Sequence, residues 1–223
     1  AGPRQRARAA RGGPGHTAVA LTPTAAGDPV RLGVFGGTFD PPHVGHLLIA
    51  IDSIERLALD RLILVPAGTQ PLKVGAITAS PADRLAMTRL LVGDDPRFAV
   101  DPIEIERGGI SYMVDTLATL AARWPGAELF LLAGADVLGT FHRWRAPERV
   151  RALATLAVLT RTAAADAPPT PSTLPGGPPL FVPTRRIDVS STEIRARLRA
   201  GQSIRGFVPE AVADHIRSAG LYR

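Results

Sequence analysis

Cysteine is absent from the 223 residues of the sequence. Without it the chain cannot form a disulfide scaffold, a cysteine-ligated zinc site, an iron–sulfur cluster or a thiol nucleophile. Long apolar runs are also missing, since none reaches the roughly 18 residues that a membrane-spanning helix needs, and no apolar segment typical of secretory signals is found. The sequence therefore predicts a cytoplasmic protein with no membrane partner, whose chemistry uses groups other than thiols.

Lysine is almost absent, because 25 of the 26 basic residues are arginine and Lys73 is the exception. The net charge of +6 is unevenly divided: four arginines and one aspartate leave +3 on the segment before residue 30, and residues 31–223 carry the other +3. This modest excess is compatible with a small phosphate-bearing ligand and is weak support for nucleic-acid binding. We therefore predict no nucleic-acid partner.

Residues 1–29 are rich in arginine, alanine, glycine and proline, begin without methionine and show no hydrophobic periodicity. These features predict a disordered or adventitious tail. An organelle transit peptide is the alternative, but Pro3 and Pro14 interrupt the segment where an amphipathic helix would be needed. The hydrophobic content of 45% and the charged content of 21% are typical of a globular protein, so we predict one domain over residues 30–223.

From residue 30 onward, short apolar runs alternate with stretches of helical periodicity. The predicted extended segments span residues 30–35, 61–66, 98–105, 128–133, 155–160 and 180–183, and the predicted helices span residues 44–57, 112–123, 190–200 and 209–219, with one more opening at Ser80 and Pro81. Strands that alternate with helices imply right-handed crossovers. We therefore predict an α/β fold, a doubly wound parallel sheet, with a proline-rich surface loop at residues 163–179 and a small C-terminal helical part at residues 184–223.

The first candidate site follows the first strand, in the sequence Gly36-Gly-Thr-Phe-Asp-Pro-Pro-His43-Val-Gly-His46. Gly36 and Gly37 are expected to let the backbone turn tightly and to admit a phosphate to the backbone amides. His43 and His46 lie three residues apart at the start of a predicted helix, so both rings face the same way as its free amides. A helix N-terminus attracts anions, and two imidazoles there would form a phosphate clamp.

Two other interpretations of this segment stay open. In one, a histidine caps the helix and the other packs against the sheet; in the second, the pair binds a divalent metal with Asp40 as a third ligand. The segment has neither the G-x-G-x-x-G pattern of dinucleotide folds nor the G-x-x-x-x-G-K-[ST] pattern of P-loop enzymes, which disfavours both nucleotide-binding modes. No H-E-x-x-H pattern is present, and we predict no tightly held metal.

The second candidate site is Ser190-Ser-Thr-Glu-Ile-Arg195. Ser190 and Glu193 have the spacing of a capping box, which predicts a helix that starts here. Ser191, Thr192 and Arg195 would then lie at the positive end of the helix, where they favour a phosphate. The alternative is a well-capped surface helix with solvated arginines, which explains Ser190 and Glu193 better than it explains the convergence of the other three.

The third candidate site follows the predicted strand at residues 128–133, where Gly134 and Asp136 precede Trp144. A carboxylate at a strand exit suits hydrogen bonds to a ribose diol, and an exposed tryptophan beside it would stack on a flat ring. Helix capping by Asp136 and core packing by Trp144 are the corresponding alternatives.

Together, the segments from Gly36 to His46 and from Ser190 to Arg195 resemble the HxGH nucleotidylyltransferase superfamily, and specifically the bacterial nicotinate-nucleotide adenylyltransferases. The resemblance covers residues 31–223 and includes the segments Arg107-Gly-Gly-Ile-Ser-Tyr112 and Asp115-Thr-Leu117. The sister family of phosphopantetheine adenylyltransferases normally has threonine where His43 stands. One local departure is that the family's usual Pro-Pro-His-Lys reads Gln70-Pro-Leu-Lys73 here. The resemblance implies a Rossmann-like nucleotidylyltransferase fold.

The resemblance also implies transfer of the adenylyl group from ATP, bound with Mg²⁺, to nicotinate mononucleotide, which gives deamido-NAD and pyrophosphate. It assigns catalysis to four residues, which are His43, His46, Lys73 and Arg195. It assigns ATP binding to Gly36, Gly37, Thr38, Phe39, His43, His46, Gly134, Asp136, Ser191, Thr192 and Arg195. It assigns the mononucleotide to Lys73, Tyr112, Met113, Trp144 and Arg145, with Trp144 stacked on the pyridine ring and backbone amides receiving the carboxylate.

Two other functions stay open on the sequence. The chain is another HxGH nucleotidylyltransferase with a different phosphorylated acceptor, such as nicotinamide mononucleotide or phosphopantetheine, or it is a non-catalytic nucleotide-binding module. The four catalytic candidates speak against the second of these. A nucleic-acid-binding role would rest on the basic tail alone. The preference for acid or amide and the formation of a homo-oligomer are left open.

Overall fold

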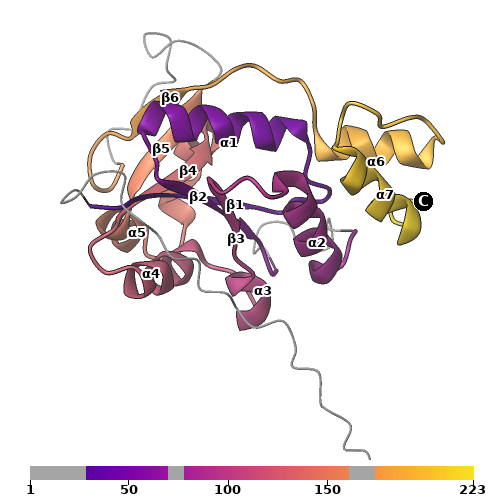
Figure 1. The fold of residues 1–223 in the computed structure, drawn as a ribbon. Helices are drawn as coiled ribbons and strands as arrows, with labels where there is room; N and C mark the ends of the chain where they lie inside the picture. Colours follow the sequence, from indigo (N-terminus) through magenta and orange to yellow (C-terminus); the bar gives the residue numbers. More distant parts are fainter. Residues whose placement is uncertain (1–28, 70–77, 161–173) are drawn as a thin grey trace, which may run out of the picture.

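The computed structural model describes residues 29–69, 78–160 and 174–223 (Figure 1). Residues 1–28 of the predicted tail, Lys73 and most of the predicted proline-rich loop lie outside these residues, so the predictions made for them stay untested. The described residues form six strands, seven α-helices and two short 3-10 helices.

Six parallel strands form one sheet in the order β3-β2-β1-β4-β5-β6. They are β1 (Arg31–Gly37), β2 (Arg61–Pro66), β3 (Phe98–Val100), β4 (Glu128–Gly134), β5 (Thr155–Thr160) and β6 (Leu180–Pro183). The order reverses between β1 and β4, because β2 and β3 lie on one side of β1 and the later strands lie on the other. The doubly wound parallel sheet expected from the sequence is confirmed. Ligands bind at such a reversal, beyond the carboxyl ends of the strands.

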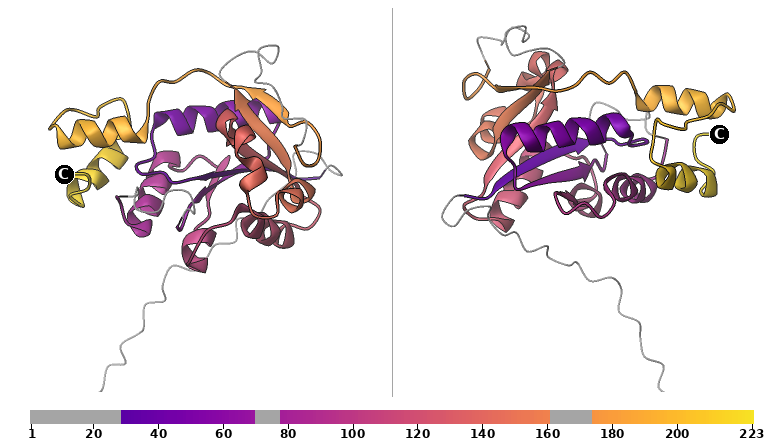
Figure 2. Two further views of the ribbon diagram at one scale, coloured as in Figure 1. Left: turned by 180° about the vertical axis from the view of Figure 1, so that it is seen from behind. Right: turned by 45° about the horizontal axis from the view of Figure 1, so that its top comes forward.

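Helices cover both faces of this sheet (Figures 1 and 2). They are α1 (Val44–Leu57), α2 (Pro81–Val92), α3 (Ile103–Arg107), α4 (Met113–Arg123), α5 (Pro147–Leu153), α6 (Ser191–Arg199) and α7 (Glu210–Ser218), with the 3-10 helices η1 (Ala135–Gly139) and η2 (Phe141–Arg143). Helices α1 and α2 share one apolar core, and α3, α4 and α5 share the other. Helices α6 and α7 lie together at one end of the molecule, next to α2.

Alternating residues of the strands build these two cores. In β2, Leu62 and Leu64 pack on the face that α1 and α2 cover, whereas Ile63 and Val65 pack on the face of α3, α4 and α5. None of the four side chains is more than 1% exposed. Because successive side chains of a strand point to opposite faces, a strand buried on both faces is apolar at every position. This is why continuous apolar runs predicted interior strands.

Two helix starts follow from their capping residues. The hydroxyl of Ser80 accepts a hydrogen bond from the amide of Asp83 at 3.1 Å, and the hydroxyl of Ser190 accepts one from the amide of Glu193 at 3.1 Å. A side-chain acceptor at this position satisfies an amide that has no partner inside the helix. Helices α2 and α6 begin at the residue after these caps, as predicted.

The extended segment predicted at residues 98–105 is partly wrong. The strand ends at Val100, and the chain then forms α3. The carboxylate of Asp101 accepts a hydrogen bond from the amide of Ile103 at 3.0 Å, which turns the chain into the helix. The apolar residues Ile103 and Ile105 alternate as they would in a strand, and a helix of five residues is too short for its own period to show in the sequence.

The segment between β6 and α6 runs over α1 (Figure 1) and is fixed there by an ion pair. The guanidinium of Arg185 donates to both carboxylate oxygens of Asp52 in α1, with a shortest distance of 2.6 Å, and the amide of Arg185 donates to the same carboxylate at 2.8 Å. Hydrogen bonding from Arg185 lowers the pKa of the buried Asp52 carboxyl. The chain that leaves β6 is therefore tied to the middle of α1.

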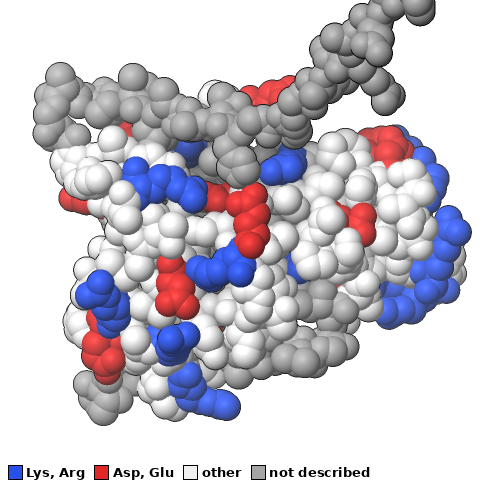
Figure 3. Space-filling model, turned by 90° about the horizontal axis from the view of Figure 1, so that it is seen from below, with Lys and Arg blue, Asp and Glu red and all other residues white. Residues whose placement is uncertain are grey.

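The surface of the described residues carries mixed charge. Figure 3 shows basic and acidic side chains next to one another over much of one face. Arg31 pairs with Glu128 at 2.6 Å, and Arg97 pairs with Asp95 at 2.7 Å. Exposed pairs of this kind add little stability, but they offset much of the arginine charge locally. None of the helices in the described part of the chain has the length and apolar character that crossing a bilayer demands.

Candidate active site

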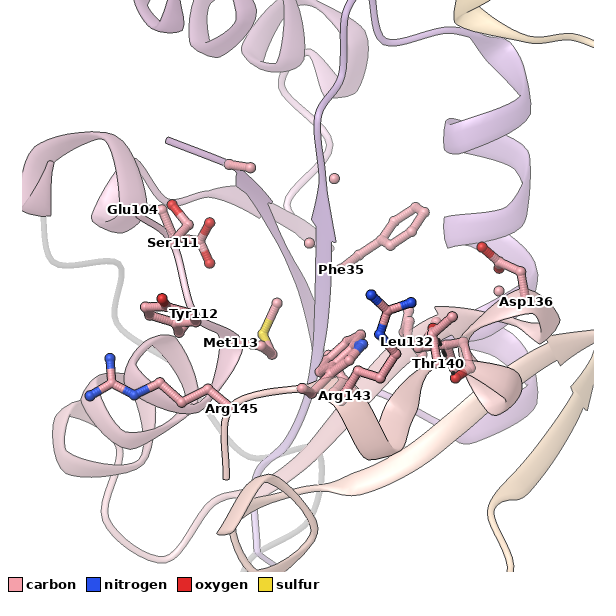
Figure 4. A pocket seen from close by; sticks show the side chains of 18 residues that line it. Phe35, Glu104, Ser111, Tyr112, Met113, Leu132, Asp136, Thr140, Arg143 and Arg145 are labelled. Atoms are coloured by element: carbon pink, nitrogen blue, oxygen red, sulfur yellow. Dashed lines mark hydrogen bonds between the residues drawn. The ribbon is translucent and has the colours of Figure 1, made fainter. Parts of the chain in front are cut away.

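A cavity of ≈ 390 Å³ lies beyond the carboxyl ends of β1 and β4, where the strand order reverses (Figure 4). Eight residues that the sequence predicted for the site line it: Gly36, Gly37, Tyr112, Met113, Gly134, Asp136, Trp144 and Arg145. Figure 4 shows Tyr112 and Arg145 at one end of the cavity and Asp136 at the other. The structure therefore joins the third candidate site to the residues predicted for the mononucleotide.

Gly36 and Gly37 act differently from the expectation. Both belong to β1 and pair with β2, and neither has a positive φ, so the predicted tight turn is wrong. What matters is the missing side chain: a Cβ on Gly36 would lie 2.6 Å from Cε of Met113, and one on Gly37 would lie 2.7 Å from the ring of Phe39. Sequence reasoning assigned a turn because glycine adopts backbone conformations that other residues avoid.

His43 and His46 meet at the start of α1, as their spacing predicted. Their ring centroids lie 3.8 Å apart, and Nδ1 of His46 accepts a hydrogen bond from the amide of His43 at 3.2 Å. The ring of His46 also packs edge-on against the buried ring of Phe39. Because Nδ1 is an acceptor, the neutral ring of His46 carries its proton on Nε2, the atom that would donate to an anionic oxygen.

His43 is the N-cap residue of α1 and is 7% exposed. The alternative interpretation, in which one histidine caps the helix and the other packs against the sheet, is therefore correct in placing a histidine at the cap. Burial lowers the pKa of His43 to about 4, which leaves its ring neutral at pH 7. Its Nδ1 is buried and has no hydrogen-bond partner among the described residues. Burying a nitrogen without a hydrogen-bond partner costs free energy. A bound ligand or a water molecule would supply the missing hydrogen bond.

We expect His43 to make the stability of the fold depend on pH in acid. Its pKa is 6.5 in the unfolded chain and about 4 in the fold, so between these values the unfolded chain binds a proton that the folded chain does not. His43 therefore adds no pH dependence above pH 6.5, and stability falls by roughly 3 kcal/mol as the pH drops toward 4. Urea unfolding at pH 7 and pH 4.5 should show a larger loss for the wild type than for His43→Gln. Equal losses would contradict a buried, neutral His43.

The ring of His43 packs against Gly45. A Cβ at this position would lie 2.9 Å from Nδ1 and 3.0 Å from Cε1 of His43. The imidazole therefore rests against the backbone of the first turn of α1. This contact gives a physical reason for glycine between the two histidines.

We expect Gly45→Ala to lower activity without lowering stability. Alanine favours a helix over glycine by about 0.5–1 kcal/mol, but its methyl group would displace the ring of His43. A misplaced group in the site should reduce kcat about ten-fold or more. Gly139→Ala is the matched control, because nothing lies within 4 Å of a Cβ added there. Steady-state kinetics and thermal melts of the two variants test this, and equal kcat values would contradict it.

The amides at the start of α1 are less available than predicted. The amide of Val44 donates to the carbonyl of Phe207 at 2.9 Å, and the amides of His46 and Leu47 both donate to the carbonyl of His43. The predicted cradle of free amides is therefore partly wrong, because a distant segment occupies the first of them. The two imidazoles at this helix start remain suited to an anion.

The second motif lies against the loop that precedes α1. The hydroxyl of Ser191 donates to the carbonyl of Pro41 at 2.8 Å. The guanidinium of Arg195 donates to the carbonyl of Asp40 at 2.7 Å and to the hydroxyl of Thr192 at 3.3 Å. Two motifs separated by 150 residues thus form one polar surface. The contact is tertiary, so the local pattern of neither motif contains it.

Asp40 does not fit the role of a third metal ligand. It is 3% exposed, and its carboxylate accepts hydrogen bonds from the amide and hydroxyl of Thr78, the amide of Ala79 and the hydroxyl of Tyr222. Both oxygens are engaged by these donors. Across residues 29–69, 78–160 and 174–223, no group of three or more His, Asp or Glu side chains is placed to hold a metal. The metal interpretation of the histidine pair therefore loses its third ligand.

Phe39 and Thr38, two residues predicted to bind ATP, make contacts within the protein that support the site. Phe39 is buried, so its ring supports His46 and does not face the cavity. The carbonyl of Thr38 accepts a hydrogen bond from the buried guanidinium of Arg84 at 2.8 Å. Lys73, predicted for both catalysis and the mononucleotide, lies outside the described residues.

Aromatic and charged side chains meet at the end of the cavity that holds Tyr112. The guanidinium of Arg145 lies 4.7 Å from the centre of the Tyr112 ring and 3.7 Å from the carboxylate of Asp115. The ring of Trp144 lies 5.3 Å from that of the buried Phe141 and also lines the cavity. Both interpretations of Trp144, core packing and contact with a ligand, therefore agree with its position.

Asp136 does not cap a helix, so the capping alternative is wrong. The N-cap residue of η1 is Gly134, and Asp136 lies inside the first turn. A Cβ on Gly134 would lie 2.6 Å from Oδ1 of Asp136. The glycine therefore leaves room for the carboxylate at the strand ends, where a ribose diol would bind.

Four polar residues of the cavity were not predicted for the site: Glu104, Ser111, Thr140 and Arg143. Glu104 is buried, which raises the pKa of its carboxyl, and it accepts a hydrogen bond from the hydroxyl of Thr116 at 2.7 Å. The guanidinium of Arg143 reaches into the cavity close to Phe35 (Figure 4). Glu104 was missed because residues 98–105 were predicted as a strand. Arg143 was missed because nothing in the sequence distinguishes it from the other 24 arginines.

Comparison with known proteins relates this geometry to a family. Residues 34–197 match the family model described as cytidylyltransferase-like. The chain is 52% identical over 197 residues to a probable nicotinate-nucleotide adenylyltransferase of Gemmatimonas aurantiaca, a match that covers 87% of this chain and 93% of that protein. It is 44% identical over 196 residues to the protein of the same name from Thermus thermophilus, covering 87% of this chain and 100% of that protein.

Solved structures of low sequence identity share the fold. The nicotinic acid mononucleotide adenylyltransferase of Plasmodium falciparum complexed with NaAD gives a TM-score of 0.69 at 17% identity, covering 86% of this chain and 97% of that one. A putative nicotinate-nucleotide adenylyltransferase of Vibrio parahaemolyticus gives 0.61 at 19% identity, covering 86% and 95%. The matching family model and the curated relatives place the chain in the cytidylyltransferase-like superfamily and, within it, in the nicotinate-nucleotide adenylyltransferase family.

Proposed function

We propose that the chain transfers the adenylyl group of ATP to nicotinate mononucleotide, which yields deamido-NAD and pyrophosphate. This is the activity for which its relatives are named. One observation carries the proposal: the loop before the histidine pair and the motif with Arg195 contact each other directly, at the end of the strand whose glycines line the cavity. The location in the cytoplasm stays a prediction from the sequence.

The triphosphate of ATP is proposed to bind between the histidine pair and the start of α6. Nε2 of His46, the hydroxyls of Ser191 and Thr192 and the guanidinium of Arg195 are donors suited to anionic oxygens. The first amides of α6 have no acceptor inside the helix, and they add partial positive charge. Asp136 would receive the ribose hydroxyls, at the strand ends that the glycines leave open.

Nicotinate mononucleotide is proposed to occupy the cavity. Trp144 offers a flat apolar surface for the pyridine ring. Met113 is the first residue of α4, so its amide has no acceptor inside that helix and suits the carboxylate, together with the amides near Tyr112 and Arg145. The guanidinium of Arg143 adds a positive charge for an acceptor that carries both a phosphate and a carboxylate.

The reaction needs no protein nucleophile. An oxygen of the 5′-phosphate of the mononucleotide forms a bond to the α-phosphorus of ATP in line, while the bond to the bridging oxygen of pyrophosphate breaks. The protein contributes by holding the two substrates in that geometry and by stabilising charge on the phosphate oxygens. In this scheme His46 and Arg195 hold the departing phosphates.

Mg²⁺ is proposed to arrive on ATP, where it neutralises phosphate oxygens. The donor set of the described residues fits this mode, because the carboxylate of Asp40 is engaged by four donors and the histidine pair has no other acid to complete a site. The guanidinium of Arg195 and the hydroxyls of Ser191 and Thr192 then bind the phosphate oxygens whose charge the metal does not neutralise.

Pyrophosphate release from MgATP tests the proposal, measured with nicotinate mononucleotide, nicotinamide mononucleotide and phosphopantetheine as acceptors. We expect the fastest release with nicotinate mononucleotide. Release with phosphopantetheine and not with the mononucleotides would indicate a different HxGH transferase. ATP binding without release for any acceptor would indicate a binding module.

A further inference from the structure

Tyr222 lies after α7, far along the chain from both motifs of the site. Its ring is 7% exposed and packs in the core that α1, α2, α6 and α7 share, and its hydroxyl donates to Oδ1 of Asp40 at 2.8 Å. A phenylalanine would fill the same apolar space, so packing explains the ring but not the hydroxyl. The feature to be explained is a buried polar contact between residues 182 positions apart.

Asp40 connects that hydroxyl to Arg195 and Ser191, which are proposed to bind the phosphates. Its carboxylate lies 4.0 Å from Nη1 of Arg195, and its carbonyl accepts a hydrogen bond from the same nitrogen at 2.7 Å. The next carbonyl, that of Pro41, accepts the hydroxyl of Ser191 at 2.8 Å. The positions of Arg195 and Ser191 therefore depend on where the backbone of residues 40 and 41 is held.

The backbone at both ends of this contact is strained. Phe39, next to Asp40, has a φ of 52°, and Tyr222 has a φ of 64°. Both lie in the left-handed region that residues other than glycine avoid, and such conformations persist where the surrounding contacts fix them. The carboxylate of Asp40 supplies these contacts, because it binds Tyr222 on one side and the residues Thr78 and Ala79 before α2 on the other.

We propose that the hydroxyl of Tyr222 is a positioning group for the phosphate side of the site, because it holds Asp40 and thereby the loop whose carbonyls orient Arg195 and Ser191. The inference rests on the proposed function in assigning Arg195 to the β and γ phosphates of ATP. Burial and the hydrogen bond to Asp40 raise the pKa of Tyr222 above its ordinary value, so the hydroxyl stays a donor at neutral pH. Arg84 and Arg195 are the cations near it.

Tyr222→Phe tests the role of the hydroxyl, since it keeps the ring and removes the donor. The measurements are KM for ATP and for nicotinate mononucleotide, kcat, the melting temperature, and the Kd of tripolyphosphate and of AMP. We expect KM for ATP and Kd for tripolyphosphate to rise about five-fold, the value of one lost hydrogen bond. KM for the mononucleotide and Kd for AMP, which lacks the β and γ phosphates, should stay unchanged.

Two further variants separate positioning from stability. His215→Ala removes the 3.1 Å contact between His215 and Asp83, which joins α7 to α2 without touching Asp40; it should lower the melting temperature and leave the Kd of tripolyphosphate unchanged. Thr78→Ala removes another donor to Asp40, and it should weaken tripolyphosphate binding as Tyr222→Phe does.

The proposal would be overturned by an unchanged Kd of tripolyphosphate in Tyr222→Phe, or by equal losses for AMP and tripolyphosphate. It would also be overturned if His215→Ala weakened tripolyphosphate binding as strongly as Tyr222→Phe. The proposed function fails separately. If the wild type binds tripolyphosphate but releases no pyrophosphate with nicotinate mononucleotide, and Tyr222→Phe weakens tripolyphosphate binding about five-fold, the reaction is disproved and the positioning role is supported.

Discussion

His46→Ala is expected to lower kcat about 10²-fold or more, the usual loss for a positioned donor to a developing charge. The ring is fixed before substrate binds, because Phe39 and His43 pack against it and its Nδ1 accepts the amide of His43. The position of Nε2 is therefore set by the protein and not by the ligand. Alanine removes this donor.

The measurement is kcat with MgATP and nicotinate mononucleotide, accompanied by a thermal melt. Alanine also leaves the amide of His43 without its acceptor, which should cost about 1 kcal/mol of stability, too little to unfold the chain. His142→Ala is the matched control, because His142 is exposed and does not line the cavity, and its kcat should equal that of the wild type. A folded His46→Ala variant with normal turnover would remove His46 from the proposed mechanism.

The sequence predicted those parts of the fold that local patterns encode. Leu62, Ile63, Leu64 and Val65 are apolar at every position because both faces of β2 are covered, and Ser190 marks the start of α6 because its hydroxyl accepts an amide within four residues. The prediction failed where local signals compete. Gly36 and Gly37 indicate a turn by their type, but they pair with β2 as part of β1, and the side chains of Met113 and Phe39 occupy the space that a Cβ would need.

The site was predictable to the same extent. A spacing of three residues on a helix brings His43 and His46 together without any tertiary information. The contacts of Asp40 with Arg195 and with Tyr222 join residues 155 and 182 positions apart. Neither hydrophobic periodicity nor a helix-capping pattern can predict contacts over such separations. The family resemblance alone brought the two motifs into one site, and it did not indicate the roles of Asp40, Glu104 or Tyr222 in the structure.

Asp40→Ala is expected to destabilise the fold by about 3–5 kcal/mol, which is the range for removing one partner from a buried charged network. The amides of Thr78 and Ala79 and the hydroxyl of Tyr222 would lose their acceptor in a place with little access to water. The buried guanidinium of Arg84 would also lose the nearby negative charge that favours its charged form.

Thermal and urea unfolding of a graded series would test this expectation. For a chain of this size, a loss of that order lowers the melting temperature by roughly 10 °C. Asp40→Asn should fall between Asp40→Ala and the wild type, because one amide oxygen still accepts the donors at Oδ1 while its NH₂ group faces the amide and hydroxyl of Thr78. Asp95→Ala, which removes an exposed pair with Arg97, should cost less than 1 kcal/mol. If Asp40→Ala were as stable as Asp95→Ala, the carboxylate would not be what holds the loop of the first motif, the residues before α2 and the residues after α7 together.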